Sequence, residues 1–202
     1  MTGVKFCGLR RREDALSANR LMPDFAGVVL SPGFKRSVSE EGACELRQIL
    51  DLRIKLVGVF VNERPERVIE LLQNGLIDAA QLHGDEPPED IERIRKASGK
   101  PVIKFFALRD GGDAAMAQAS PADFVLLDSG TGTGKAFDWT LTQLVRRPFF
   151  LAGGLTAGNV GDAIRTCRPY AVDVSSGIET EGKKDFEKMA AFLAAVSKEE
   201  AI

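Results

Sequence analysis

The sequence predicts an α/β protein that folds as a single-domain (βα)8 barrel, a TIM barrel, and three observations support this prediction. Eight short apolar runs recur along the 202 residues, amphipathic charge-rich segments lie between them, and polar or glycine residues gather where the runs end. No linker, low-complexity stretch or change of composition divides the chain, so we expect one domain over residues 1–202. An open, doubly wound sheet is the alternative architecture.

The apolar runs are the expected strands of a parallel sheet. The run 55–61 is apolar on both faces, as in strands that have helices outside and packed side chains inside. Strict alternation with helical segments predicts parallel pairing, and eight units of this length match a compact barrel. The expected strands are 4–7, 25–30, 55–61, 79–83, 101–107, 122–128, 148–152 and 171–175.

Several helices have recognisable starts. Ser39 precedes a charged first turn, and Pro65 and Pro87 occupy first-turn positions. Asp185 opens the last helical segment, in which apolar residues repeat at helical spacing. The expected helices are 39–50, 65–74, 87–97, 157–167 and 185–197, with less regular patterns at 110–120 and 138–146.

Composition restricts the classes of function. A net charge of −2 provides no basic surface for nucleic acid, and no apolar run reaches the length of a membrane span. The three cysteines, Cys7, Cys44 and Cys167, form no CxxC pair, which argues for a reducing compartment and a cytoplasmic location. We expect either a monomer or a homodimer. His83 is the single histidine, which excludes a multi-histidine metal site, and we expect no metal.

Cys7 and Asp128 end the first and sixth expected strands, at the barrel end where such folds carry their sites. Lys5 shares a strand face with Cys7, and a neighbouring positive charge lowers the pKa of a thiol. A buried cysteine is more often a small apolar side chain, and an aspartate after a strand often caps a loop. The presence of both at one barrel mouth favours a general acid and base pair.

Glycine and serine residues after the last two strands predict a phosphate site. Gly153 and Gly154 follow the seventh strand, and Ser176 and Gly177 follow the eighth. Exposed backbone amides at these positions form the phosphate site of many barrels. The alternative is that these glycines only close tight turns.

Three further side chains are candidates for substrate contact. Arg36 is suited to clamping a carboxylate or else belongs to a solvated basic loop, and His83 is a ligand contact or a structural histidine. Asp173 shares a face with Ser175, where it binds sugar hydroxyls or joins an internal polar network. The segment 130–135 fits neither a P-loop nor GxGxxG, so we expect a mobile loop over the site or a plain connection.

Strand-end motifs occur in a fixed order from residue 3 to about residue 195. They are Lys5-Phe6-Cys7-Gly8, Lys35-Arg36, 57–62, Gln81-Leu82-His83-Gly84, Leu127-Asp128-Ser129, Gly132-Thr133-Gly134, Phe137-Asp138-Trp139, Ala152-Gly153-Gly154-Leu155 and 173–179. This ordered set resembles the phosphoribosylanthranilate isomerase family of tryptophan biosynthesis.

The resemblance implies an Amadori rearrangement that needs no cofactor. The phosphorylated small-molecule substrate, N-(5-phosphoribosyl)anthranilate, would become 1-(o-carboxyphenylamino)-1-deoxyribulose 5-phosphate. Asp128 would protonate the ring oxygen, and Cys7 as thiolate would take the C2 proton. The implied substrate contacts are Arg36 at the anthranilate carboxylate with His83 nearby, Asp173 at a ribose hydroxyl, and Gly153, Gly154, Ser176 and Gly177 at the phosphate.

Other activities fit less well. A related histidine-pathway isomerase would use two aspartates, and Cys7 stands where the first is needed. A metal-dependent pentose-phosphate epimerase needs several ligands at strand ends, which one histidine does not supply. A catalytically silent barrel that binds a phosphorylated ligand is the alternative from a different class, and the presence of Cys7 together with Asp128 argues against it.

Overall fold

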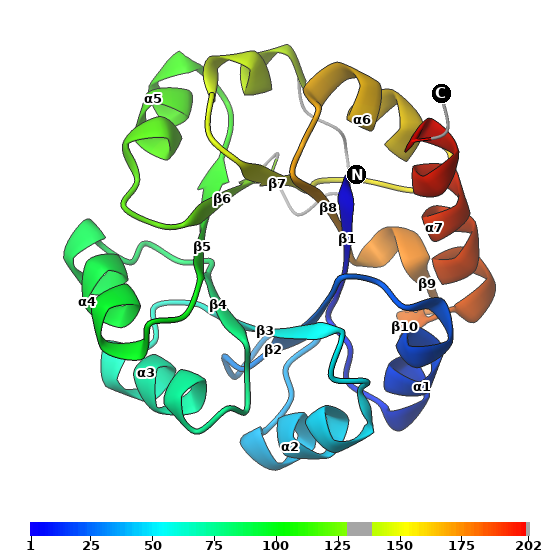
Figure 1. The fold of residues 1–202 in the computed structure, drawn as a ribbon, viewed down its shortest axis with the longest axis horizontal. Helices are drawn as coiled ribbons and strands as arrows, with labels where there is room; N and C mark the ends of the chain where they lie inside the picture. The colour runs from blue at the N-terminus through cyan, green and yellow to red at the C-terminus, as the bar shows by residue number, and fades with distance from the viewer. Residues whose placement is uncertain (129–138, 201–202) are drawn as a thin grey trace.

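The computed structural model describes residues 1–128 and 139–200, whereas residues 129–138 and 201–202 lie outside the described part. Eight parallel strands close into a barrel in chain order, with β1 paired to both β2 and β8 (Figure 1). The predicted barrel is confirmed, and the open-sheet alternative is wrong. The strands are β1 (Gly3–Cys7), β2 (Phe25–Val29), β3 (Lys55–Phe60), β4 (Ala79–Leu82), β5 (Val102–Ala107), β6 (Phe124–Asp128), β7 (Phe149–Leu151) and β8 (Ala171–Val174).

Helices surround the barrel and cover the outward faces of its strands (Figure 1). The Ser39 hydroxyl accepts the N–H of Gly42 at 3.2 Å, as expected of a helix cap. No described helix is long and apolar enough to cross a membrane. The helices are α1 (Arg12–Leu21), α2 (Glu40–Ile49), α3 (Pro65–Gln73), α4 (Pro88–Ser98), α5 (Gly111–Ala119), α6 (Val160–Cys167), α7 (Phe186–Glu200) and the 3-10 helices η1 (Trp139–Leu144) and η2 (Ser176–Ile178).

The segment 138–146 differs from the α-helix that its pattern suggested, since its described part forms the 3-10 helix η1. The hydroxyl of Thr142 donates to the carbonyl of Trp139 at 2.7 Å, and the N–H of Val145 bonds the carbonyl of Thr142. Bonds that span three residues tighten the turn, and a hydroxyl that bonds the local backbone competes with the regular α-helical ladder.

Helix α1 has no counterpart among the expected helices, because charged residues dilute its apolar stripe. The carboxylate of Asp14 accepts the backbone N–H groups of Arg10 and Arg11 at 3.0 and 3.1 Å, and the Arg11 guanidinium pairs with it at 2.6 Å. Ala15 and Ala18 are buried against the barrel. The start of α1 therefore depends on a side-chain contact with the backbone, which hydrophobic periodicity does not reveal.

The barrel interior contains its own apolar cluster. Ile103, Leu126 and Phe150 are buried there, and the rings of Phe25 and Phe124 pack edge-on against Phe150. A larger cluster fills the space between the strands and the helices. Both apolar clusters are buried, so they support the polar side chains at the carboxyl ends of the strands.

A two-stranded hairpin between η2 and α7 was not expected from the sequence. Its strands are β9 (Glu179–Thr180) and β10 (Lys183–Lys184), and two residues with positive φ, Glu181 and Gly182, form the turn. The guanidinium of Arg10 donates to the carbonyl of Gly182 at 2.6 Å. The hairpin is thereby attached to the loop that follows β1.

Candidate functional site

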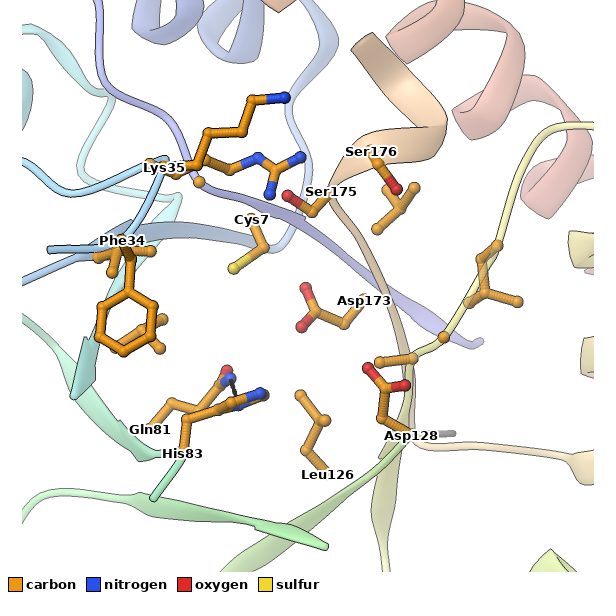
Figure 2. Close-up of a pocket in the computed structure, with 18 of the residues that line it drawn as sticks. Cys7, Phe34, Lys35, Gln81, His83, Leu126, Asp128, Asp173, Ser175 and Ser176 are labelled. Atoms are coloured by element: carbon orange, nitrogen blue, oxygen red, sulfur yellow. Dashed lines mark hydrogen bonds between the residues drawn. The ribbon is translucent and has the colours of Figure 1, made fainter. Parts of the chain in front are cut away.

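A cavity of about 390 Å³ opens at the carboxyl ends of the strands (Figure 2). Its wall is formed by strand-end residues and by the loops that follow them, from opposite sides of the barrel. The sequence-predicted site residues on this wall are Cys7, Arg36, His83, Asp128, Gly153, Gly154, Asp173 and Ser176. The structure therefore brings together side chains that are far apart in the sequence.

Beside Cys7 lies a buried ion pair inside the barrel. Lys5 is fully buried, and its Nζ lies 3.1 Å from both carboxylate oxygens of Asp173. Burial lowers the pKa of Lys5, but Asp173 and the Cys7 thiol more than offset this, so the net pKa is raised and the ammonium keeps its charge. Asp173 thus belongs to an internal polar network and also faces the cavity.

Gly27 on β2 makes room for both Lys5 and Cys7. A Cβ at Gly27 would lie 2.9 Å from the Cys7 Sγ and 3.2 Å from the Lys5 Nζ. Both side-chain ends therefore occupy the space that a larger residue on β2 would need. The absence of a side chain at Gly27 therefore leaves room for both the thiol and the ammonium.

Burial raises the pKa of the Cys7 thiol above its ordinary value. Lys5 and Lys184 act in the opposite direction and Asp173 adds to the rise, but desolvation is the largest effect. Lys5 lowers this pKa as expected, but the net shift is upward because desolvation is larger. The position of Lys5 was predicted correctly, but the cost of burying a thiolate was not visible in the sequence.

Asp128 stands across the mouth from Cys7, at the end of β6. Its carbonyl accepts the N–H of Leu108 at 2.8 Å, which fixes the strand end against β5. Figure 2 shows its carboxylate directed into the cavity, with Asp173 between it and Cys7. A ligand in the cavity therefore has a carboxylate on one side and a thiol on the other.

His83 is held by two neighbours. Its ring stacks on Phe105 with centroids 4.0 Å apart, and its Nδ1 lies 3.0 Å from the amide nitrogen of Gln81. Burial lowers the pKa of His83, so the ring is neutral at neutral pH. The amide oxygen of Gln81 is buried and has no partner among the described residues. An orphaned acceptor beside a cavity suits a ligand donor.

Arg36 lines the cavity, and its contacts involve residues that the sequence did not single out. Its guanidinium bonds both carboxylate oxygens of Glu179 at 2.7 Å, and Lys184 bonds the same carboxylate at 2.8 Å. Phe34, which is half exposed, also forms part of the cavity wall (Figure 2). Gln81 was recognisable from its shared strand face with His83, but nothing local marks the Glu179 contacts.

The glycine-rich end of the cavity lies after β7 and β8. Gly153 and Gly154 have φ of 92° and 64°, where a side chain would be strained, and both contribute to the cavity wall with Ser176. Gly177 does not line the cavity. A Cβ there would collide with the carbonyl of Leu155, so Gly177 permits close packing between the two loops.

Two further features concern the loop after β6 and metal binding. The segment 130–135, expected to form a loop over the site, lies outside the described residues. Within 1–128 and 139–200, no group of three His, Cys, Asp or Glu side chains is arranged to hold a metal ion.

Comparison with known proteins places the chain among isomerases. The family model of N-(5'-phosphoribosyl)anthranilate isomerase matches residues 4–195. The N-(5'-phosphoribosyl)anthranilate isomerase of Endomicrobium trichonymphae is 41% identical over 194 residues, covering 94% of this chain and 95% of the relative. That of Caldanaerobacter subterraneus is 44% identical over 200 residues, covering 96% and 97%.

Solved structures agree in fold. The phosphoribosyl anthranilate isomerase of Thermus thermophilus superposes with a TM-score of 0.88 at 36% identity, covering 98% of this chain and 99% of that one. A second, in complex with reduced 1-(o-carboxyphenylamino)-1-deoxyribulose 5-phosphate, has a TM-score of 0.87 at 36% identity, covering 98% and 100%. The relative from Thermotoga maritima is described as dimeric. With this coverage and identity, the chain belongs to the N-(5'-phosphoribosyl)anthranilate isomerase family.

Proposed function

We propose that this chain converts N-(5-phosphoribosyl)anthranilate to 1-(o-carboxyphenylamino)-1-deoxyribulose 5-phosphate, with Asp128 as general acid and Cys7 as general base. The observation that carries the proposal is the placement of these two side chains on opposite sides of one cavity. A similar protein binds the reduced form of the same product, which supports this choice of substrate.

Asp128 opens the sugar ring in the first step. Its carboxylic acid donates a proton to the furanose oxygen, the bond from that oxygen to C1 breaks, and the nitrogen lone pair forms an iminium. The proton, the ring oxygen and the nitrogen electrons all stay in the substrate, so no cofactor is required.

Cys7 acts in the second step as the thiolate. The iminium acidifies the proton on C2, Cys7 removes it, and the resulting enolamine tautomerises to the ketone. The raised thiol pKa opposes this step in the protein alone. Two opposite unit charges about 4 Å apart attract by about 4 kcal/mol at the effective dielectric of a protein site, so the iminium cation itself favours the thiolate beside it.

The two ends of the substrate would occupy different walls. Arg36 would bind the anthranilate carboxylate, with neutral His83 close by, and Asp173 would bond a ribose hydroxyl. Gly153, Gly154 and Ser176 line the glycine-rich end of the cavity and would hold the phosphate through backbone amides and a hydroxyl; Gly177 would shape that loop. Both anchors would hold the reacting carbons between Cys7 and Asp128.

The location and assembly of the enzyme are part of the same proposal. Three cysteines without a disulfide suit a reducing cytoplasm. A dimeric relative makes a homodimer a candidate beside the monomer. Sedimentation velocity distinguishes the two states directly.

Turnover of the Cys7→Ser and Asp128→Asn variants tests the mechanism. A fluorescence assay that follows loss of the anthranilate substrate should show at least ~100-fold lower turnover in each, because each lacks one proton-transfer group. Both should still bind the reduced product. Cys44→Ser, which changes an exposed cysteine, should retain the activity of the unaltered chain. Full activity of either Cys7→Ser or Asp128→Asn would contradict the proposed mechanism.

A further inference from the structure

The guanidinium of Arg36 has one edge already occupied. Its Nε and Nη2 donate to the two oxygens of Glu179, each at 2.7 Å, in a bidentate pair. Its stem packs on the backbone just after Cys7, since a Cβ on Gly8 would lie 2.5 Å from the Arg36 Cδ. Arg36 therefore leaves only its remaining Nη edge for a ligand in the cavity.

Glu179 is itself held in place. Its side chain is 7% exposed and bonds Lys184 at 2.8 Å, whose side chain is 2% exposed. The Lys184 ammonium also donates to the carbonyl and the hydroxyl of Ser175 at 3.0 and 3.3 Å, so all three of its donors are used. Although burial alone would raise it, Arg36 and Lys184 lower the pKa of Glu179 to about 2, and it remains a carboxylate.

The backbone around Glu179 and Lys184 is tied down as well. Lys188 donates to the carbonyl of Glu179 at 2.7 Å, and Arg11 donates to the carbonyl of Lys184 at 3.2 Å. The hairpin β9–β10 thus connects the loop after β8 to the loops after β1 and β2. A carboxylate on such a support has a defined position before any ligand arrives.

We infer that Glu179, anchored by Lys184, is a positioning residue that reserves Arg36 for the aromatic carboxylate of the substrate. This inference rests on the proposed function and concerns how that site distinguishes the two anionic ends of its substrate. Together Arg36, Glu179 and Lys184 carry a net charge of +1, which matches one carboxylate.

The physical reason is competition between anions. A phosphate ester carries more charge than a carboxylate, so an unrestrained arginine pairs with the phosphate and draws the substrate in reversed. Glu179 opposes this by occupying the Nε and Nη2 edge of the guanidinium and by neutralising part of its charge. The carboxylate of the aromatic ring then meets the remaining Nη edge of Arg36, which is already oriented.

Ligand discrimination tests the inference. The probes are reduced 1-(o-carboxyphenylamino)-1-deoxyribulose 5-phosphate and its phenylamino counterpart without the carboxylate, bound to the full chain and measured by calorimetry. The unaltered chain should prefer the carboxylated probe by at least ~30-fold, as a charge-assisted contact implies. Glu179→Gln should reduce this preference at least ~10-fold, because the amide presents donors to a guanidinium that has only donors.

Kinetics and a double variant supply the controls. Glu179→Gln should raise KM ~10-fold with kcat changed less than ~3-fold, since the carboxylate is remote from the reacting carbons. Inhibition by inorganic phosphate should become stronger, because Arg36 is no longer neutralised by Glu179, and an unaltered circular dichroism spectrum excludes general loss of the fold. In an Arg36→Ala background, Glu179→Gln should alter the preference less than ~2-fold, because its effect passes through Arg36.

The outcomes separate the two levels of proposal. If Arg36→Ala removes the preference and Glu179→Gln leaves it intact, the inference is wrong and the proposed function stands. If Arg36→Ala itself keeps the preference, the assignment of Arg36 in the proposed function is wrong. Should Glu179→Gln fail to fold with Lys184 unpaired, Glu179→Gln combined with Lys184→Met removes the buried charge and gives the same readout.

Discussion

At the residue scale, the chemistry of Cys7 depends on a balance between burial and charge. Lys5 was identifiable as its neighbour because strand residues alternate between faces. Desolvation nevertheless raises the pKa of the thiol, and the cations Lys5 and Lys184 only moderate the rise. Burial depends on every strand around the barrel, so a local pattern does not reveal its extent.

The titration of Cys7 should reflect this balance. In a Cys44→Ser and Cys167→Ala background, thiolate absorbance should develop above the pH range of an ordinary cysteine, because burial raises the pKa. Adding Lys184→Met should move the transition to still higher pH, since Lys184 lowers the pKa of Cys7. Because the base is the thiolate, kcat/KM should rise with pH through the same transition. A transition within or below the range of an ordinary cysteine would contradict the raised pKa of Cys7.

Gly27 offers a residue-scale test of geometry. Gly27→Ala places a methyl group 2.9 Å from the Cys7 sulfur and 3.3 Å from the Cys7 Cα, so the thiol has to shift, and the change should lower kcat at least ~10-fold. Gly58→Ala is the matched control, since its methyl group would meet Ile77, Phe60 and Leu30. It should lower the melting temperature and leave kcat nearly unchanged. Equal kcat values for the two variants would contradict the role of Gly27.

At the element scale, buried polar side chains hold the loops that follow the strands. Glu86 accepts the N–H groups of Asn62 and Gly84 at 2.8 and 3.1 Å and pairs with Lys104 at 2.8 Å. The side chains of Glu86 and Lys104 are 3% and 7% exposed. This cluster joins the loops after β3 and β4 to strand β5, directly beside His83.

Breaking the Glu86–Lys104 pair should lower the stability of the fold. Lys104→Met leaves a buried carboxylate without its cation and should reduce the free energy of unfolding by about 3–5 kcal/mol, measured in urea. Adding Glu86→Gln should recover much of the loss, because the amide oxygen still accepts the two backbone N–H groups. Lys96→Met removes the exposed pair with Glu92 on α4 and should change stability little. Equal losses from both lysine variants would contradict this account.

The elements that the sequence predicted are those with a periodic apolar face. Strands such as 55–61 and helices such as 39–50 and 185–197 bury that face against the barrel, so their pattern records their environment. Helix α1 begins on the Asp14 contacts, and the hairpin 179–184 has strands of two residues, too short for a pattern. Such elements depend on partners elsewhere in the fold.

At the scale of the whole molecule, closure of the barrel makes the chain one cooperative unit, as we propose for its domain organisation. Thermal unfolding should show one transition with equal calorimetric and van't Hoff enthalpies, about 140 kcal/mol near 60 °C from the usual enthalpy per residue. Differential scanning calorimetry measures both. Two resolved transitions would contradict a single domain.

The sequence predicts only part of the site, because some of its residues depend on contacts between distant loops. Cys7, Asp128 and Asp173 lie at strand ends, and the fold class alone places strand ends at one mouth. The Arg36 to Glu179 contact joins residues 143 positions apart, between loops whose conformation no periodicity describes. The sequence thus located the groups that face the cavity, but not the groups that orient them.

The pair between Lys5 and Asp173 has a consequence for synthesis of the chain. The two residues are 168 positions apart, on strands that meet only when β8 docks beside β1. A nascent chain that lacks β8 carries Lys5 without its carboxylate, and the interior does not accept an uncompensated ammonium. The environment of Cys7 is therefore completed in the same event that seals the barrel, and no partly synthesised chain presents a finished catalytic centre.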